Sequence, residues 1–213
     1  MHVEILPGLV KKGIMVSTGK LQELDVKPSR KESFKALTRE LKLEMKGRFP
    51  TLDHVREDRT VRALRQFYWS IGIDPTKTRP SSEALLRRLL KKELPMINNL
   101  VDAGNLASVR TIIPIGIYDM DRIKGDLVLR SAGSGERFVG IGGVDSELDE
   151  GIPVLADDEG VIHLYPHRDC MRTRITERTC NALIVACGAM GIKKKHLDAA
   201  VEDVSYFWRQ LRE

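Results

Sequence analysis

The sequence predicts an α+β fold, in which a β-rich core is flanked by helices at both ends of the chain. Three observations lead to this prediction. Apolar residues recur at helical spacing before residue 95, short β-like runs separated by Gly- and Asp-rich turns fill residues 111–165, and helical spacing returns towards the C-terminus. Because strands and helices are segregated along the chain, they do not form the alternating βαβ units of a parallel sheet.

The N-terminal region begins with strand-like segments and continues as helices. Ser29 and Glu32 have the spacing of a capping box, so we expect each side chain to bind the other residue's backbone amide at a helix N-terminus. Gly47 is expected to end this helix. The expected elements of this region are strands at 2–6 and 13–17 and helices at 29–47, 53–71 and 83–92.

In the second half of the chain, the spacing of apolar residues changes from helical to strand-like and then back to helical. Pro95 breaks the helical pattern. We expect a mainly helical segment at 1–94 that packs on a core at 95–213. The expected elements of the core are a helix at 99–110, strands at 111–118, 126–130, 138–141, 152–156 and 161–165, and two closing helices at 177–190 and 195–212.

Composition and motifs exclude several classes of protein. No apolar run approaches the roughly 20 residues that span a bilayer, and Glu4 and Pro7 interrupt any signal peptide, so we expect a cytoplasmic protein without membrane contact. Cys180 and Cys187 are seven residues apart in the expected helix at 177–190 and are interpreted as buried hydrophobes on one face. The chain has no phosphate-binding P-loop, dinucleotide turn, HExxH or CxxC motif, so no metal and no cofactor are expected.

Charge is distributed unevenly along the chain. Residues 1–95 contain 21 Lys and Arg against 12 Asp and Glu, whereas residues 96–165 contain 5 against 12 and residues 166–213 contain 9 against 6. A basic N-terminal region can hold a phosphate backbone. Amphipathic helices with solvated faces produce the same pattern. Both interpretations remain open from the charges alone.

Polar residues gather in the segment 95–119, around the start of the expected helix at 99–110. Asn98, Asn99, Asp102 and Asn105 stand among apolar residues with no charge run beside them. Amide side chains both donate and accept hydrogen bonds, which suits a pocket for a polar ligand. Alternatively, they cap the helix and tie down the loop before it.

A second group of polar residues follows the expected strand at 161–165. His167, Arg168 and Asp169 form a continuous run, and Thr173 lies just beyond them. Arg and His beside Asp can bind a phosphate or carboxylate, and Asp or His can position a water molecule. Alternatively, residues 176–179 cap the N-terminus of the following helix. That interpretation explains these four residues well, but it does not explain the His-Arg-Asp run.

At these two groups the sequence resembles the B3/4 domain of the phenylalanyl-tRNA synthetase β subunit. The resemblance covers residues 95–187, and residues 79–88 resemble free-standing proteins that carry this domain. Its motifs are Ile97–Asp102, Asn105, Pro114–Asp119, Asp126–Arg130, Gly135-Glu136, Leu155–Asp157 and Glu177–Leu183.

The resemblance implies a function on tRNA. In the synthetase this domain is the editing module, which hydrolyses the ester of mischarged tRNA, so the resemblance implies a tRNA-binding protein and a free-standing aminoacyl-tRNA deacylase. It implies neither aminoacylation nor a catalytic synthetase subunit. Two positions depart from the family: Gly116 stands where bacterial synthetases carry a histidine of the editing site, and the turn at 166–170 replaces one that carries a substrate-binding glutamate.

The expected deacylase site joins the two polar groups in one pocket. Asp169 or His167 would position the attacking water, replacing the missing family residues. Two rival functions stay open: a non-catalytic RNA-binding module, and a pocket for a free amino acid or related metabolite. The expected substrate-binding residues are Asn98, Asn99, Asp102, Asn105, Arg168 and Thr173, and the expected RNA-binding residues are Arg79, Arg87, Arg88, Lys91 and Lys92.

Overall fold

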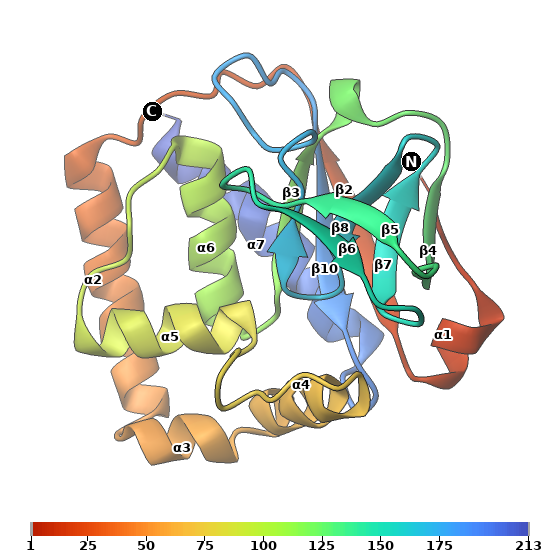
Figure 1. The fold of residues 1–213 in the computed structure, drawn as a ribbon. Helices are drawn as coiled ribbons and strands as arrows, with labels where there is room; N and C mark the ends of the chain where they lie inside the picture. The colour runs from red at the N-terminus through yellow and green to blue at the C-terminus, as the bar shows by residue number, and fades with distance from the viewer. Residues whose placement is uncertain (1, 213) are drawn as a thin grey trace.

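A three-stranded antiparallel sheet lies between a layer of helices and a second sheet in the computed structural model, which describes residues 2–212 (Figure 1). Its middle strand is β10 (Ala182–Gly188), which pairs with β2 (Met15–Leu21) on one side and β3 (Ile115–Asp119) on the other. In this register Ile184 stands opposite both Gly19 and Ile117. Strands from both ends of the chain therefore meet at the centre of the fold.

The second sheet has five strands in the order β1-β4-β7-β8-β9. Strand β1 is parallel to β4, and the other neighbours are antiparallel. A separate hairpin is formed by β5 and β6. The bounds are β1 Val3–Ile5, β4 Leu127–Ser131, β5 Glu136–Val139, β6 Asp145–Leu148, β7 Pro153–Asp157, β8 Gly160–Leu164 and β9 Arg168–Asp169.

Seven α-helices and a short 3₁₀ turn, η1 (Met120–Arg122), complete the described residues. Helices α6 and α7 cover one face of the central sheet, and α2 and α5 pack outside α6. The α-helices are α1 Pro7–Lys11, α2 Lys31–Arg48, α3 Leu52–Glu57, α4 Arg59–Ser70, α5 Ser81–Lys91, α6 Asn99–Thr111 and α7 Lys194–Leu211. None of the helices within residues 2–212 is long and apolar enough to cross a membrane.

Strand β10 separates two hydrophobic clusters. Ala182 and Ile184 pack with α6 and α7, whereas Leu183 and Val185 pack with the second sheet. Successive side chains of a strand point to opposite faces, which produces this division. Gly104 of α6 lies so close to Ile117 that a Cβ atom there would overlap that side chain. The helix therefore packs tightly on the central sheet.

The structure confirms the α+β class and most of the expected elements, but the helix at 177–190 is wrong. That segment contains β10, whose seven residues are all buried. A strand buried on both faces reads as a continuous apolar run, which cannot be distinguished from a buried helix by its period. Cys180 and Cys187 therefore do not share a helical face: Cys180 is exposed in the preceding loop, and Cys187 is buried in β10.

Two helix boundaries also differ from the expectations. The single helix at 53–71 is two helices, because Asp58 leaves the helical backbone and its side chain caps α4 by accepting from the amides of Thr60 and Val61 at 2.8 and 3.3 Å. The expected capping box at Ser29 is wrong, because its hydroxyl instead binds Asp102, 73 residues away. Helix α1, strand β6 and strand β9 were not expected.

Candidate functional site

The amides at the start of α6 bind backbone. Asn98 is the N-cap, and its side-chain oxygen accepts from the Val101 amide at 2.9 Å. Asn99 is fully buried: its oxygen accepts from the Lys27 amide at 3.2 Å, and its side-chain nitrogen donates to the Asp25 carbonyl at 3.0 Å. These contacts tie the segment before α2 to the helix.

Asp102 extends the same tether. Its buried carboxylate accepts from the Ser29 hydroxyl at 2.6 Å and from the Ile97 amide at 2.9 Å. Burial raises the pKa of Asp102, and the two hydrogen bonds oppose that rise. Asn105, one turn further along α6, is half-buried. Within the described residues, every side-chain hydrogen bond of Asn98, Asn99 and Asp102 therefore goes to the first turn of α6 or to the segments before α2 and α6.

Asp169 is the centre of a separate polar network. One oxygen of its carboxylate accepts from the Tyr118 hydroxyl at 2.9 Å and lies 2.8 Å from Nδ1 of His163. Tyr118 is fully buried, and burial together with the negative charge of Asp169 raises its pKa well above the ordinary value. The carboxylate thus provides a hydrogen-bond partner for the buried Tyr118 hydroxyl of β3 and for the His163 ring of β8. Neither partner was expected from the sequence, although each lies within an expected strand.

A cysteine continues this network. The Cys187 sulfur lies 3.9 Å from Nε2 of His163, so the three residues follow the order of a Cys-His-Asp catalytic triad. The thiol is only 1% exposed. Burial raises the pKa of Cys187 far above its usual value, followed in size by the charge of Asp169. A protonated thiol without access to substrate is not a nucleophile, so the arrangement is structural.

Gly116 leaves the space that the Tyr118 hydroxyl occupies. A Cβ atom built at position 116 would overlap with the hydroxyl oxygen of Tyr118. In the resembled family a histidine stands at the position of Gly116. Here the Tyr118 side chain, two residues further along β3, occupies the space of a side chain at position 116. While Tyr118 binds Asp169, position 116 accepts only glycine.

The turn between β8 and β9 places His167 and Arg168 differently. His167 is half-buried, and its Nδ1 has no hydrogen-bond partner among the described residues. Its ring lies 6.0 Å from that of Tyr68. Burial, with the nearby His163 and Arg168, lowers the pKa of His167 to about 4, so the ring is neutral at neutral pH. Arg168 is exposed, and its guanidinium lies 6.0 Å from the Phe138 ring centre.

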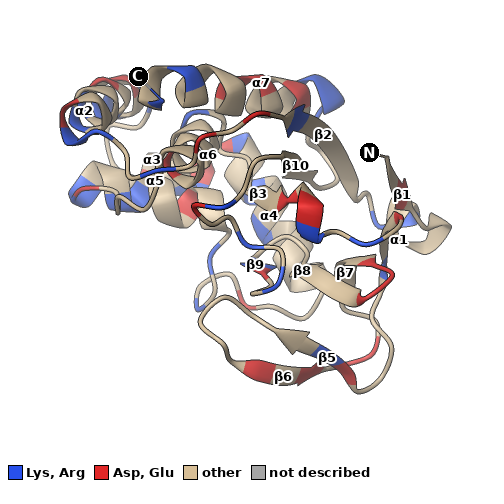
Figure 2. Cartoon of the chain, turned by 90° about the horizontal axis from the view of Figure 1, so that it is seen from above, with Lys and Arg blue, Asp and Glu red and all other residues tan. Residues whose placement is uncertain are grey.

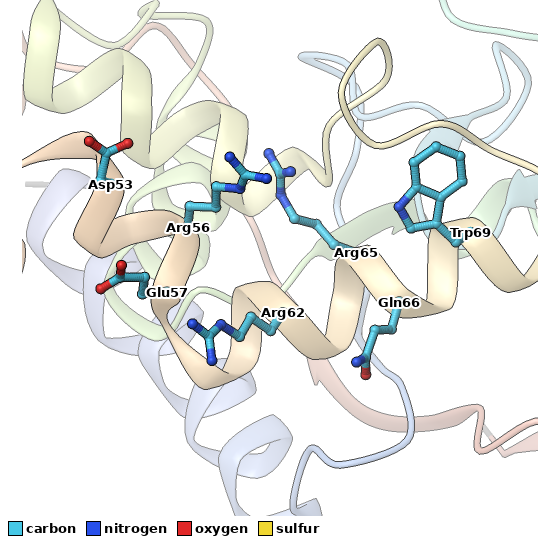
Figure 3. Close-up of a pocket in the computed structure, with 7 residues that line it drawn as sticks. All are labelled: Asp53, Arg56, Glu57, Arg62, Arg65, Gln66 and Trp69. Atoms are coloured by element: carbon cyan, nitrogen blue, oxygen red, sulfur yellow. The ribbon is translucent and has the colours of Figure 1, made fainter.

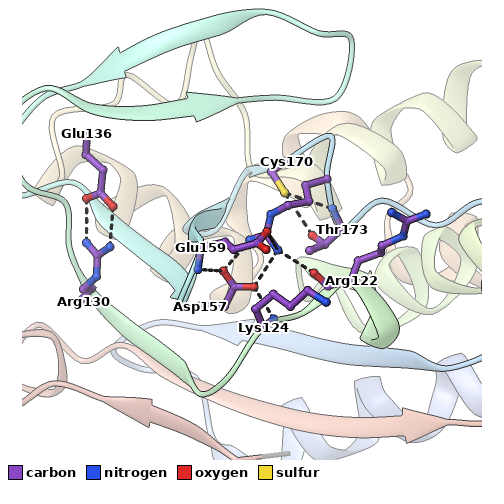
Figure 4. A network of polar contacts seen from close by, with 9 residues as sticks. Arg122, Lys124, Arg130, Glu136, Asp157, Glu159, Cys170 and Thr173 are labelled. Carbon is purple, nitrogen blue, oxygen red and sulfur yellow. Dashed lines mark hydrogen bonds and ion pairs between the residues drawn. The ribbon is translucent and has the colours of Figure 1, made fainter.

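The residues after β9 form a network that holds the loop in place (Figure 4). The fully buried Thr173 hydroxyl lies 3.2 Å from the Cys170 sulfur. Arg172 donates two hydrogen bonds to Asp157, at 2.6 and 2.9 Å, and a third to the Arg122 carbonyl at 2.7 Å. The expected substrate-binding residue Thr173 therefore faces the loop interior.

The structure places the two polar groups in separate hydrogen-bond networks, and their place in one pocket stays a prediction. Helix α6 belongs to the cluster on one face of the central sheet, whereas Tyr118 and Cys170 belong to the cluster on the other. The hydrogen-bond networks of Asp102 and Asp169 share no residue. Within residues 2–212, no group of three His, Cys, Asp or Glu residues is placed to hold a metal ion.

The arrangement of two sheets and flanking helices matches a known family. The family model of the B3/4 domain matches residues 63–210. The chain belongs to the B3/4 domain family. That match begins within α4, so it includes α5 and the tethered start of α6 as well as both sheets.

Relatives of this B3/4 protein include phenylalanine–tRNA ligase β subunits. The chain is 27% identical over 197 residues to that of Aquifex aeolicus, which covers 86% of this chain and 25% of the relative. It is 33% identical over 108 residues to that of Mycoplasma genitalium, covering 50% and 13%. The chain thus spans a quarter or less of the length of these relatives.

A solved structure shares the fold. It is an N-terminal fragment of the phenylalanyl-tRNA synthetase β subunit from Pyrococcus horikoshii, with a TM-score of 0.53 and 15% identity. The match covers 99% of this chain and 48% of the fragment. At this identity the likeness concerns the fold, and it extends over the N-terminal helices as well as the B3/4 core.

The charged surface of the B3/4 protein is divided between its helical and β-rich parts. Lys and Arg are spread over α2 to α5, whereas the β5–β6 hairpin and the loop after it are largely acidic (Figure 2). Of the expected RNA-binding residues, Arg79, Arg88, Lys91 and Lys92 are exposed. The fifth, Arg87, is half-buried and donates to the buried Glu83 at 2.7 Å.

One hollow of about 280 Å³ lies between α2 and α5 in this basic region. Lys35, Arg39, Lys42 and Lys92 line it, together with a single carboxylate, Glu93. The ammonium group of Lys42 donates to the Lys92 carbonyl at 3.0 Å. The expected RNA-binding residue Lys92 therefore lies beside cations from α2 that lie more than 45 residues earlier in the chain.

Proposed function

We propose that this B3/4 protein binds RNA, with tRNA as its ligand. The observation that carries the proposal is a basic helical surface joined to a B3/4 fold whose relatives are β subunits of phenylalanine–tRNA ligase. Phosphate contacts dominate the affinity of proteins for nucleic acids. The exposed cations at Arg79, Arg88 and Lys91 supply such contacts without base specificity.

Binding of tRNA at increasing salt concentration tests the proposal. The affinity should fall steeply, with a slope of log K against log salt of about −0.9 for each phosphate contacted. Alanine at Arg88 or Lys91 should reduce the slope by about one. Absence of tRNA binding at low salt would contradict the proposal. A rise in melting temperature with a free amino acid, and none with tRNA, would favour the small-molecule function instead.

Hydrolysis of an aminoacyl ester is a second, finer proposal. It is supported by Asp169, whose side chain is 31% exposed and whose second oxygen has no hydrogen-bond partner among the described residues. Tyr118 and His163 hold the first oxygen, which fixes the direction of the second. We propose that this oxygen takes a proton from a water molecule as the water attacks the ester carbonyl, giving free amino acid and tRNA.

Release of amino acid from a panel of mischarged tRNAs tests this second proposal. Asp169→Asn keeps an acceptor for Tyr118 and His163 but removes the base, so release should fall at least tenfold while the melting temperature stays within a few degrees. Arg174→Ala, an exposed change nearby, serves as the control. Equal release by the Asp169→Asn and unaltered proteins, or no release from any tRNA, would remove the hydrolytic role and leave RNA binding intact.

A further inference from the structure

We propose that the outward surface of α4 is a binding track for single-stranded RNA, on which Trp69 stacks with an unpaired base. The proposal rests on the proposed RNA-binding function and adds the place and the form of RNA. Trp69 and the arginines beside it were not among the residues expected to bind. Their only sequence signal is a tryptophan on the polar side of an amphipathic helix.

The first part of the track is a hollow of about 520 Å³ between α3 and α4 (Figure 3). Arg56 projects from α3, and Arg62, Arg65 and Trp69 project from successive turns of α4. The side chains of Arg65 and Trp69 point to the same side of the helix. Arg65 is held by Glu83, so among the described residues Arg56 and Arg62 supply the free guanidinium groups of this hollow, and Trp69 supplies its aromatic face.

Two further hollows continue along α4. The second, of about 360 Å³, shares Gln66 with the first and is also lined by Lys12 and Met190. The third, of about 410 Å³, is lined by Gly191, the residue after Met190, and by the residues that follow it. It contains Arg59, Lys193, Lys195 and His196 but no carboxylate. The three hollows together are lined by residues of α4 from Arg59 to Ser70.

The charge of the track suits a phosphate backbone. Seven Lys and Arg residues line the three hollows, against two carboxylates, Asp53 and Glu57. Among these cations only Arg65 forms an ion pair within residues 2–212, with Glu83. The others have no partner there that would compete with phosphate. His196 adds little positive charge at neutral pH, because burial and the nearby Arg48 lower its pKa.

Trp69 distinguishes single-stranded RNA from duplex. Its side chain is 58% exposed, and an aromatic face of this kind stacks on bases that have left the helical stack. The bases of a duplex are already stacked on one another, so their faces are not available. A basic groove combined with an exposed aromatic residue is the usual construction of single-strand binding sites.

Fluorescence anisotropy with a labelled single-stranded RNA of about ten nucleotides tests the track. Trp69→Ala should weaken binding by about tenfold, and Trp69→Tyr, which keeps a ring, should restore most of it. Arg62→Ala should also weaken binding and lower the salt slope by about one. The matching duplex should lose affinity with Arg62→Ala but not with Trp69→Ala.

Two substitutions outside the track serve as controls. Leu43→Ala removes an apolar side chain that is 67% exposed on α2, and Lys35→Ala removes a cation from the hollow between α2 and α5. Binding of the single strand should be insensitive to Leu43→Ala and less sensitive to Lys35→Ala than to Arg62→Ala. A direct readout is the quenching of Trp69 fluorescence by RNA in a Trp208→Phe protein.

The outcomes separate the two proposals. If Trp69→Ala and Arg62→Ala bind the single strand as tightly as the unaltered protein does, the α4 track is wrong. Salt-dependent tRNA binding that is lost on Arg88→Ala or Lys91→Ala would then keep the proposed function and move the interface to α5. Absence of binding to either RNA at low salt would overturn both.

Discussion

At the scale of single residues, Gly116 is a position that accepts no side chain. The Tyr118 hydroxyl occupies the space of a side chain at 116 and binds Asp169, which also holds His163. A sequence shows only that position 116 lacks a side chain. The structure adds the reason, because the tyrosine that fills the space lies in the same strand and its partner lies 51 residues away.

Gly116→Ala should therefore destabilise the protein by about 1–3 kcal/mol, because the new methyl group displaces the Tyr118 hydroxyl from Asp169. Denaturant unfolding measures the change. Gly47→Ala is the matched control: nothing lies within 4 Å of a Cβ atom at that position in α2, so it should leave stability unchanged or raise it by about 0.4–1 kcal/mol. A Gly116→Ala protein as stable as the unaltered one would contradict this account of the site.

Side-chain roles in the amide group were only partly predictable. Asn98 is an N-cap, as its place before an apolar helical pattern allowed. Asn99 and Asp102 bind residues 25–29, more than 70 positions earlier, and no local pattern indicates such partners. The alternative that these groups tie down a loop agrees with the contacts, and the substrate-binding role of the expected residues stays a prediction.

At the scale of elements, a buried carboxylate joins two helices. Glu83 near the start of α5 is fully buried and accepts from Arg65 of α4 at 2.8 Å and from Arg87 of its own helix at 2.7 Å. Burial acts to raise the pKa of Glu83, but the hydrogen bonds from both arginines outweigh it and lower the pKa below the usual value. The contact fixes α4 beside α5 within the helical layer.

Because the folded-state pKa of Glu83 lies below its unfolded value of about 4.3, its ionised form stabilises the protein above that pH. This contribution should be lost as the pH falls below about 4 towards the folded-state pKa. Glu83→Gln should cost about 3 kcal/mol at pH 7 and should flatten the decline of stability with acid. Urea unfolding between pH 7 and pH 3 measures both effects.

Glu40→Gln, an exposed change on α2, is the control for Glu83→Gln and should alter stability by less than about 0.5 kcal/mol. An acid profile that is the same in the Glu83→Gln and unaltered proteins would show that Glu83 is not the group that titrates. Equal stability of the two proteins at pH 7 would remove its role in joining α4 to α5.

The wrong assignment of β10 as a helix has a physical origin. Amphipathic helices such as α2, α5 and α7 were identified because one face is apolar and the other polar. Strand β10 is buried on both faces by α6, α7 and the second sheet, so its sequence carries no alternation. Its neighbours decide its conformation, because β2 and β3 offer backbone hydrogen bonds along both of its edges.

At the scale of the whole molecule, the N-terminal residues are part of both sheets. Strand β1 pairs with β4, and β2 pairs with β10. In addition, Asn99 and Asp102 bind the segment before α2. We therefore propose that residues 1–94 fold only together with residues 95–213, on which they pack.

One cooperative unfolding transition should follow from this arrangement. Trp69 on α4 and the buried Trp208 on α7 report on the two parts of the chain. In Trp208→Phe and Trp69→Phe proteins, the fluorescence transition of the remaining tryptophan should coincide with loss of circular dichroism within the same protein. A transition of Trp69 well before the loss of helical signal would show that the N-terminal part unfolds separately.

The sequence by itself determined the α+β class, the amphipathic helices, the basic N-terminal half and the family resemblance. Each of these depends on patterns that neighbouring residues share, such as a period of apolar side chains or a run of charge. The same patterns placed most of the strands, since their turns carry Gly and Asp.

Only the tertiary structure decided that β10 is a strand, that Asp169 binds Tyr118 and His163, and that Asp102 and Asp169 belong to separate hydrogen-bond networks. It also decided that three hollows with seven Lys and Arg residues in their lining lie against α4. These outcomes depend on pairings between residues that are distant in the chain, and the free energy of such contacts arises from packing and hydrogen bonding that no local period records.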